Sequence, residues 1–140
     1  MVASRAARLA IRAHRAIYRL TRGRVGSRLG HLEQVLLTTT GRTTGEPRTT
    51  PLAVTAVGDR LVLVASDGGA DRDPGWYRNL VAHPDVVVQR GAVRHAMRAR
   101  TAAGDERAEL WSAVVANNPG YAAYQAKTDR QIPVVVCEPR

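Results

Sequence analysis

The loop TTTGRTTGEPRTTP, residues 38–51, combines residue types that can bind an anion. Gly41 and Gly45 allow the backbone to turn tightly, while Arg42 and Arg48 bracket a run of threonine hydroxyls. Backbone N–H groups in such a turn, together with a guanidinium fork, can hold a phosphate or a carboxylate. The loop lacks both the GK[ST] ending of a Walker loop and the GxGxxG spacing, so an ordinary polar hairpin stays open.

A second stretch, SDGGADRDPGWYRNL, residues 66–80, joins glycines and aspartates to adjacent aromatics. The glycines let the backbone approach a ligand, and Ser66 follows a strand pattern. We expect a helix with Asp73 as its N-cap and Pro74 at its first position, whose N–H groups favour negative charge. Trp76 and Tyr77 would then form an aromatic wall beside an anion site. The alternative is that Trp76 only anchors the helix to its domain.

Tyr121 and Tyr124 are three residues apart and so share one face of a helix. Two phenols on one face suit a planar ligand, or a carbonyl group that needs a hydrogen-bond donor. The alternative is core packing, with each hydroxyl bonded to backbone.

Other reactive side chains form no site. The histidines (His14, His31, His83 and His95) lack ligand spacing, so we expect no metal. Cys137 lies in an apolar run and is expected to be buried and inert. Hydroxyls, amides and aromatics without an acid–base pair suit an enzyme whose cofactor supplies the chemistry.

Apolar and β-branched runs predict the elements that position these residues. We expect strands at 34–40, 48–57, 60–66, 85–90, 93–102 and 133–139, with hairpin turns at Gly58-Asp59 and Gly91-Ala92. Helices are expected from Asp73, over 105–117, and in a short segment carrying both tyrosines. The fold class is therefore mainly β (α+β), a closed or half-closed antiparallel barrel of about six strands with inserted helices.

Residues 1–30 form a basic arm before the domain of residues 31–140. Six arginines spaced 3, 4, 3, 4, 3 lie on one stripe of a predicted amphipathic helix: Arg5, Arg8, Arg12, Arg15, Arg19 and Arg22. They carry much of the net charge of +9. The helix could pack on its own domain, bind an anionic membrane surface, or bind nucleic acid, but no nucleic-acid reading motif follows it.

Length and cysteine usage set further bounds. A chain of 140 residues fits one domain, and a single cysteine suits a reducing, cytoplasmic setting. No apolar run approaches the roughly 20 residues of a membrane span. We therefore expect a cytoplasmic protein, with peripheral membrane contact through the arm as an open possibility.

The two loops and the segments DERAELW and PGYAAYQAKTDRQIPVVVCEP occur in an order that resembles the deazaflavin (F420)-dependent nitroreductase family. The resemblance covers roughly Leu36 to Pro139 and implies a split β-barrel that binds coenzyme F420, a deazaflavin with a phosphate and an oligoglutamate tail. It implies hydride transfer to a quinone, an enone or a nitroaromatic. Split barrels also suggest a homodimer by analogy.

The resemblance places a set of residues at the cofactor: Arg42, Thr43, Thr44, Arg48, Thr49, Thr50, Pro51, Leu52, Ala53, Val64, Ala65, Ser66, Asp67, Gly75, Trp76, Tyr77, Arg78, Asn79 and Tyr121. Tyr121, Tyr124 and Ser66 are the candidates to hydrogen-bond the developing negative charge.

The sequence departs from the family pattern in two places. Thr43 and Thr44 replace a Lys-Ser pair, which removes one cation from the predicted anion loop. Asn118 stands where relatives active on nitro compounds carry a third tyrosine, which favours quinones and enones over nitroaromatics. A non-catalytic carrier of F420 or of a lipid-like ligand, and an FMN enzyme, remain as alternatives.

Overall fold

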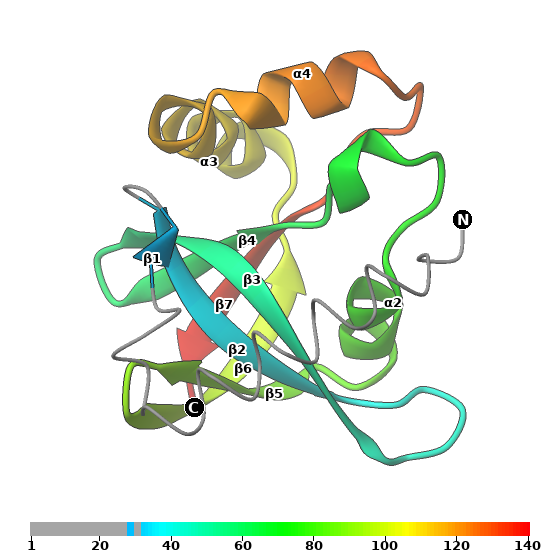
Figure 1. Ribbon diagram of the computed structural model, residues 1–140, viewed down its shortest axis with the longest axis vertical. Helices are drawn as coiled ribbons and strands as arrows, with labels where there is room; N and C mark the ends of the chain where they lie inside the picture. Colours follow the sequence, from blue (N-terminus) through cyan, green and yellow to red (C-terminus); the bar gives the residue numbers. More distant parts are fainter. Residues whose placement is uncertain (1–27, 30–31) are drawn as a thin grey trace.

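The computed structural model describes residues 28–29 and 32–140 (Figure 1), so the predicted helix of the basic arm lies outside the described residues. The elements in chain order are β1 (Arg28–Leu29), β2 (Leu32–Thr40), β3 (Pro47–Val57), β4 (Arg60–Val64), the 3₁₀ turn η1 (Asp67–Gly69), α2 (Gly75–Ala82), β5 (Asp85–Arg90), β6 (Val93–Thr101), α3 (Gly104–Asn117), α4 (Gly120–Ala126) and β7 (Val134–Pro139).

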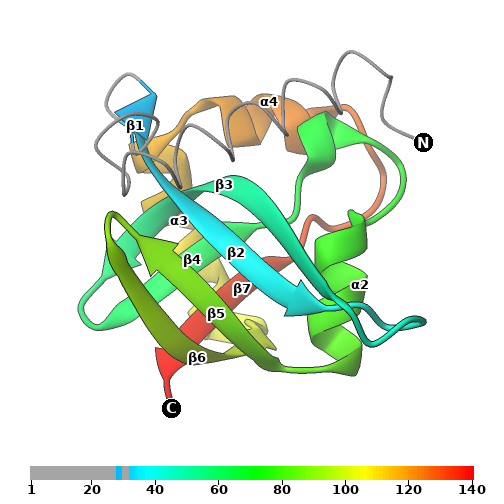
Figure 2. The ribbon, with the colours of Figure 1, turned by 60° about the horizontal axis from the view of Figure 1, so that its bottom comes forward.

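Six of these strands close into an antiparallel barrel in the order β2, β3, β4, β7, β6, β5 (Figure 2). The closing pair is β2 with β5, where Leu37 stands opposite Val88. Both side chains are fully buried, so the seam is sealed by apolar contact as well as by backbone hydrogen bonds. The predicted mainly β fold with inserted helices is confirmed, and the barrel is closed.

Strands β4 and β7 are apolar at every buried position because both of their faces are covered. Leu61 and Leu63 of β4 point into the barrel core, while Val62 and Val64 join a second cluster outside it. The alternation follows from the two-residue period of a strand. Helices α3 and α4 supply the outer cover, and they lie together over this side of the barrel in Figure 1.

Helix α2 covers a different part of the barrel through Trp76 and Leu80, which both belong to the barrel core. Their spacing of four places them on one face of the helix. The helix begins at Gly75, one residue later than expected, and Pro74 precedes it with φ −65° and ψ 155°. Asp73 is not its N-cap, which corrects the prediction, because the Asp73 carboxylate accepts a hydrogen bond from Arg130 instead.

Both predicted hairpin turns are confirmed, and Gly58 and Gly91 adopt φ of +63° and +62°. The predicted strand 60–66 is two residues too long. β4 ends at Val64 because Asp67 takes φ +44°, which turns the chain into η1.

Cys137 lies on β7 in the barrel core and is fully buried, as expected. Burial raises the pKa of its thiol to about 12, so the thiolate that would react is scarce at neutral pH. Among the described residues, no helix has the length and apolar character needed to cross a membrane.

Candidate functional site

The loop between β2 and β3 is held in one shape by its own backbone. The N–H of Gly41 donates to the Glu46 carbonyl at 2.7 Å, and the N–H of Gly45 donates to the Gly41 carbonyl at 2.8 Å. Gly45 adopts φ +72°, a conformation that favours glycine. A Cβ on Gly41 would lie 2.8 Å from the Thr44 hydroxyl oxygen and 3.1 Å from the Glu46 carbonyl oxygen, so a larger residue here would crowd the loop. The two glycines therefore fix where the arginines stand.

Asn79 of helix α2 ties this loop to the barrel. Its side-chain oxygen accepts from the Arg42 backbone N–H at 3.2 Å and from the Arg42 guanidinium at 2.8 Å. Its amide nitrogen donates to the Thr39 hydroxyl at 3.2 Å, and both Asn79 and Thr39 are buried. Asn79 thus orients Arg42 from beneath the loop.

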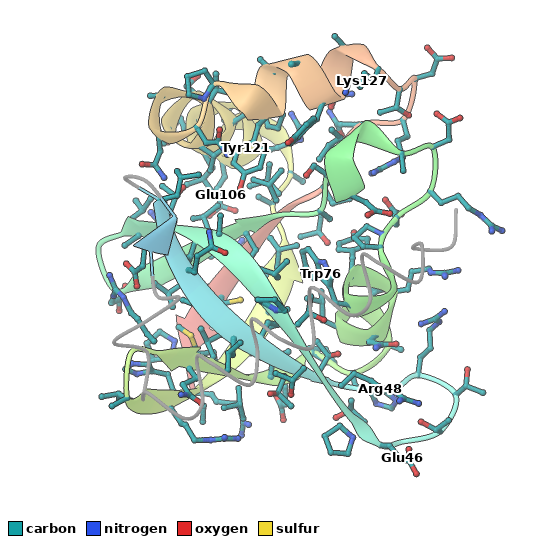
Figure 3. All side chains as sticks on the ribbon, viewed as in Figure 1. Glu46, Arg48, Trp76, Glu106, Tyr121 and Lys127 are labelled. Carbon is teal, nitrogen blue, oxygen red and sulfur yellow. The ribbon has the colours of Figure 1, made fainter. Side chains whose placement is uncertain are left out.

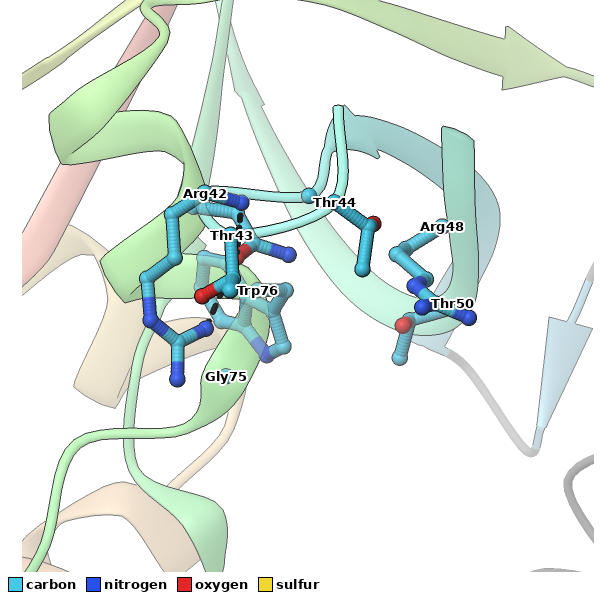
Figure 4. Close-up of a pocket in the computed structure, with 9 residues that line it drawn as sticks. Arg42, Thr43, Thr44, Arg48, Thr50, Gly75 and Trp76 are labelled. Atoms are coloured by element: carbon cyan, nitrogen blue, oxygen red, sulfur yellow. Dashed lines mark hydrogen bonds between the residues drawn. The ribbon is translucent and has the colours of Figure 1, made fainter. Parts of the chain in front are cut away.

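A cavity of about 330 Å³ opens between the loop and the start of α2 (Figure 4). It is lined by Gly41, Arg42, Thr43, Thr44, Arg48, Thr50, Gly75, Trp76 and Asn79. The Arg48 side chain is 55% exposed, and its ion pair with Glu46 is long, at 3.9 Å. The first N–H groups of a helix have no intrahelical acceptor, so Gly75 adds a donor beside the two arginines. This first cavity suits a negatively charged group.

A second cavity, of about 660 Å³, combines aromatic, apolar and hydroxyl groups. It is lined by Gln34, Thr50, Pro51, Leu52, Ala53, Val64, Ser66, Asp67, Gly68, Pro74, Gly75, Trp76, Tyr121 and Tyr124. The rings of Tyr121 and Tyr124 stand edge to face, with centroids 6.4 Å apart. The two tyrosines therefore share one face, as predicted, and that face looks into the cavity.

The two cavities meet, because Thr50, Gly75 and Trp76 line both of them. In Figure 3, Trp76 is labelled between Tyr121, beneath α4, and Arg48, at the start of β3. The site is therefore one elongated cleft with a cationic end and an aromatic end. An extended molecule with an anionic tail and a planar ring fits this division of chemistry.

Burial raises the pKa of Tyr121 above its ordinary value, and the nearby Tyr124 adds to the rise. A hydrogen bond with the Asn118 side chain opposes it. Asn118 also accepts from the Gly120 N–H at 3.1 Å and so helps to start α4. Because the phenol of Tyr121 stays neutral, it remains able to donate a hydrogen bond into the second cavity.

Arg130 holds the segment that follows β4. Its guanidinium donates to the carbonyls of Ala65, Ser66 and Ala70 and to the carboxylate of Asp73. These bonds fix the turn that presents Ser66 and Asp67 to the second cavity.

The structure brings most of the predicted residues together, but four lie outside both cavities: Thr49, Ala65, Tyr77 and Arg78. The Thr49 hydroxyl bonds that of Thr38 at 2.9 Å, and Ala65 is buried in the barrel core. Arg78 is exposed on α2.

Tyr77 is a correction, because it was expected to form a wall with Trp76. Its hydroxyl lies 2.8 Å from that of Thr101, its ring meets that of Trp76 edge to face with centroids 6.4 Å apart, and it lines neither cavity. Adjacent helical residues point about 100° apart, so Tyr77 is turned away from the direction in which Trp76 meets the cavities.

Gly41, Gly68 and Pro74 line the cavities and lie in the two predicted stretches, but they were not named as cofactor contacts. Sequence reasoning missed Gln34, which lines the second cavity, and Arg130, which holds the turn beside it. Gln34 is a buried polar residue in an apolar strand, which was a usable signal. Arg130 gave no local signal, because its partners are about 60 residues away in sequence. Among the described residues no cluster of histidine, cysteine or acidic side chains could hold a metal ion.

Comparison with known proteins agrees with this geometry. The family described as F420H(2)-dependent quinone reductase matches residues 10–139. An F420H(2)-dependent quinone reductase of Mycobacterium tuberculosis strain H37Rv is 46% identical over 130 residues, which cover 90% of this chain and 87% of that protein.

Two solved structures share the fold. One is described as an F420-H2 dependent reductase (FDR-A), with a TM-score of 0.70 and 42% identity over 75% of this chain and 93% of that one. Another, described as a domain-swapped dimer, has a TM-score of 0.74 and 38% identity, covering 91% of this chain and 94% of that one. This chain belongs to the F420H(2)-dependent quinone reductase family, which makes it an oxidoreductase with reduced coenzyme F420 as its cofactor.

Proposed function

We propose that this chain reduces a quinone in the second cavity, where the reduced form of the deazaflavin F420 would supply a hydride and solvent a proton to give the hydroquinone. The observation that carries the proposal is the continuity of the two cavities at Thr50, Gly75 and Trp76. A cofactor with a polyanionic tail and a planar ring needs both kinds of lining within reach of one molecule.

The cationic end would hold the tail of the cofactor. Arg42 and Arg48 flank the mouth of the first cavity, with Thr43 and Thr44 between them in sequence (Figure 4). Guanidinium groups bind phosphate and carboxylate through paired hydrogen bonds, which Arg48 can offer because half of its side chain is exposed. Hydroxyls in place of the family's usual Lys-Ser pair contribute donors without charge.

The aromatic end would place the acceptor. Trp76 gives a flat wall at the junction, so a ring can lie against it. The phenol of Tyr121 would donate a hydrogen bond to a quinone oxygen as negative charge develops there. Ser66 and Tyr124 line the same cavity and are the further donors.

Quinones are the acceptors that the family name carries, and enones are our second proposal because they share a conjugated carbonyl. Nitroaromatics are third, because Asn118 stands where relatives active on nitro compounds carry a third tyrosine. Mixing the protein with reduced F420 and a series of naphthoquinones, enones and nitroaromatics ranks the three classes. F420 binding without oxidation by any acceptor would instead indicate a carrier.

We further propose a homodimer and a membrane-surface contact through the arm of residues 1–30. The dimer is supported by the similar structure described as a domain-swapped dimer, and light scattering of the purified protein tests it. The membrane contact is supported only by the arginine stripe in the sequence. Deleting residues 1–28 should release the protein from anionic vesicles and leave F420 affinity unchanged.

A further inference from the structure

Arg130 is an inward-facing cation with a fully occupied guanidinium. Its side chain is 15% exposed, and it lies between α4 and β7. It donates to the Ala70 carbonyl at 2.7 Å, the Ser66 carbonyl at 2.9 Å and the Ala65 carbonyl at 3.2 Å, and it pairs with Asp73 at 2.9 Å. The acceptors span the whole segment between β4 and α2, so one side chain gathers that segment.

Gln125 of α4 fixes the backbone at Arg130 and just after it. Its side-chain nitrogen donates to the Arg130 carbonyl at 2.7 Å, and its side-chain oxygen accepts from the Ile132 N–H at 2.9 Å. A single amide thus ties the chain that carries Arg130 to the helix that carries Tyr121 and Tyr124.

The turn η1 also packs closely against helix α4 at Gly69. A Cβ on Gly69 would lie 2.6 Å from the carbonyl oxygen of Tyr124, and Gly69 adopts φ +86°. The turn η1 therefore already touches the backbone of α4. The hydrogen bonds of Arg130 and Gln125 and this close approach therefore act on the same pair of elements.

We propose that Arg130 and Gln125 are positioning residues that set the width of the quinone site. One wall of the second cavity is the turn with Ser66, Asp67 and Gly68, and the other is the tyrosine face of α4. This inference rests on the proposed function, since it assigns the second cavity to the quinone. Neither Arg130 nor Gln125 lines the cavity, so both act through the residues they hold.

The chemistry explains why an arginine stands here. Its planar fork presents five donors in fixed directions, which suits three carbonyls and a carboxylate that approach from different sides. A lysine keeps the charge but donates from a single nitrogen, so it cannot serve all four acceptors. Arg130→Lys should therefore loosen the segment while leaving its charge balance intact.

The test compares two acceptors of different width, a one-ring benzoquinone and a two-ring naphthoquinone. We expect Arg130→Lys to change the ratio of their KM values by at least about fivefold, with a smaller change in kcat. The Kd for F420 should change by a smaller factor than the KM ratio, because Arg42 and Arg48, which would hold the tail, are untouched. Asp73→Asn, which leaves the three carbonyl bonds in place, should change the ratio less.

A structural role alone would lower the melting temperature and shift both KM values together, and that result overturns the proposal. Gln125→Glu is the second variant if Arg130→Lys fails to fold: it keeps an acceptor for Ile132 but loses the donor to Arg130. It too should alter the KM ratio, and an unchanged ratio counts against the proposal. A wild-type protein that reduces neither quinone would refute the proposed function itself.

Discussion

At the scale of single residues, Trp76 shows how one side chain supports both the fold and the site. Its ring belongs to the barrel core, yet it also lines both cavities. Burial of a ring this large fixes helix α2, and the fixed helix in turn presents Gly75 and Asn79 to the arginine loop. The wall of the cleft is therefore as rigid as the core behind it.

Arg48 offers the clearest test of the anion site. Replacing it with alanine should weaken F420 binding by about 1.5–3 kcal/mol, the usual value of a hydrogen bond to a charged group. Titration of cofactor fluorescence measures this loss. Arg94→Ala is the control, because Arg94 is exposed on β6 and lines neither part of the cleft. If both variants lost the same amount of F420 affinity, the effect of Arg48 would be one of overall charge and not of direct binding.

Tyr121→Phe should lower kcat by roughly tenfold or more, as expected when a donor to developing charge is lost. The Kd for F420 should change by less than about twofold, since the tail is bound elsewhere. Steady-state kinetics with a naphthoquinone, together with a fluorescence titration, separates the two effects. Equal loss of turnover and affinity would give Tyr121 a binding role instead.

The raised pKa of Tyr121 gives a prediction about pH. Burial keeps the Tyr121 phenol protonated in the folded protein. Ionisation of this group should therefore not reduce kcat at any pH below 10.0, the ordinary pKa of a tyrosine phenol. Above that pH the unfolded phenol ionises first, which lowers the free energy of unfolding as the pH rises. Tyr121→Phe should lose this part of the pH dependence in denaturant melts. If kcat of the wild type fell between pH 7 and 9 while kcat of Tyr121→Phe stayed constant, Tyr121 would be ionising in this range and the raised pKa would be contradicted.

Residue types in the sequence were enough to find the arginine loop and the two tyrosines. They could not show which of Trp76 and Tyr77 faces the cleft, because helix rotation depends on packing against the barrel. Nor could they show Arg130, whose role exists only once β4, α2 and β7 are assembled.

At the scale of elements, η1 is the least ordinary piece of backbone in the site. Asp67, Gly68 and Gly69 all adopt positive φ, with values of 44°, 65° and 86°. A non-glycine residue pays for this conformation, so Asp67 holds a small strain at the edge of the second cavity.

Gly68 and Gly69 form a matched pair for testing the contact between η1 and α4. Alanine at Gly68 meets no atom within 4 Å and should cost about 1–2 kcal/mol, from backbone conformation alone. Alanine at Gly69 also meets the Tyr124 carbonyl and should cost at least about 1 kcal/mol more. Denaturant unfolding measures both losses in the free energy of unfolding. Equal losses would show that α4 can move away from an added Cβ at Gly69 without a further loss of stability.

The strands were predictable because hairpin glycines and β-branched runs mark them locally. Their ends were less so: β4 stops at Val64 because of the turn that follows, and α2 starts after Pro74 because Asp73 is taken by Arg130. In both cases a distant contact overrides a local preference.

At the scale of the whole molecule, the cleft separates two kinds of chemistry along its length. Cations gather where the β2–β3 loop meets α2, and phenols gather where η1 meets α4 (Figure 3). The closed barrel connects these ends through β3, which contributes Thr50 to both cavities. One rigid strand thereby fixes the distance between tail site and ring site.

The most direct test of this division compares F420 with the same deazaflavin lacking the phosphate and glutamate tail. Fluorescence titrations with the wild type and with Arg48→Ala give four dissociation constants. The two-part cleft predicts that Arg48→Ala weakens F420 by roughly 10-fold or more and leaves the tail-less deazaflavin within about twofold. If Arg48→Ala weakened both ligands equally, or neither, the arginine loop would not be the tail site.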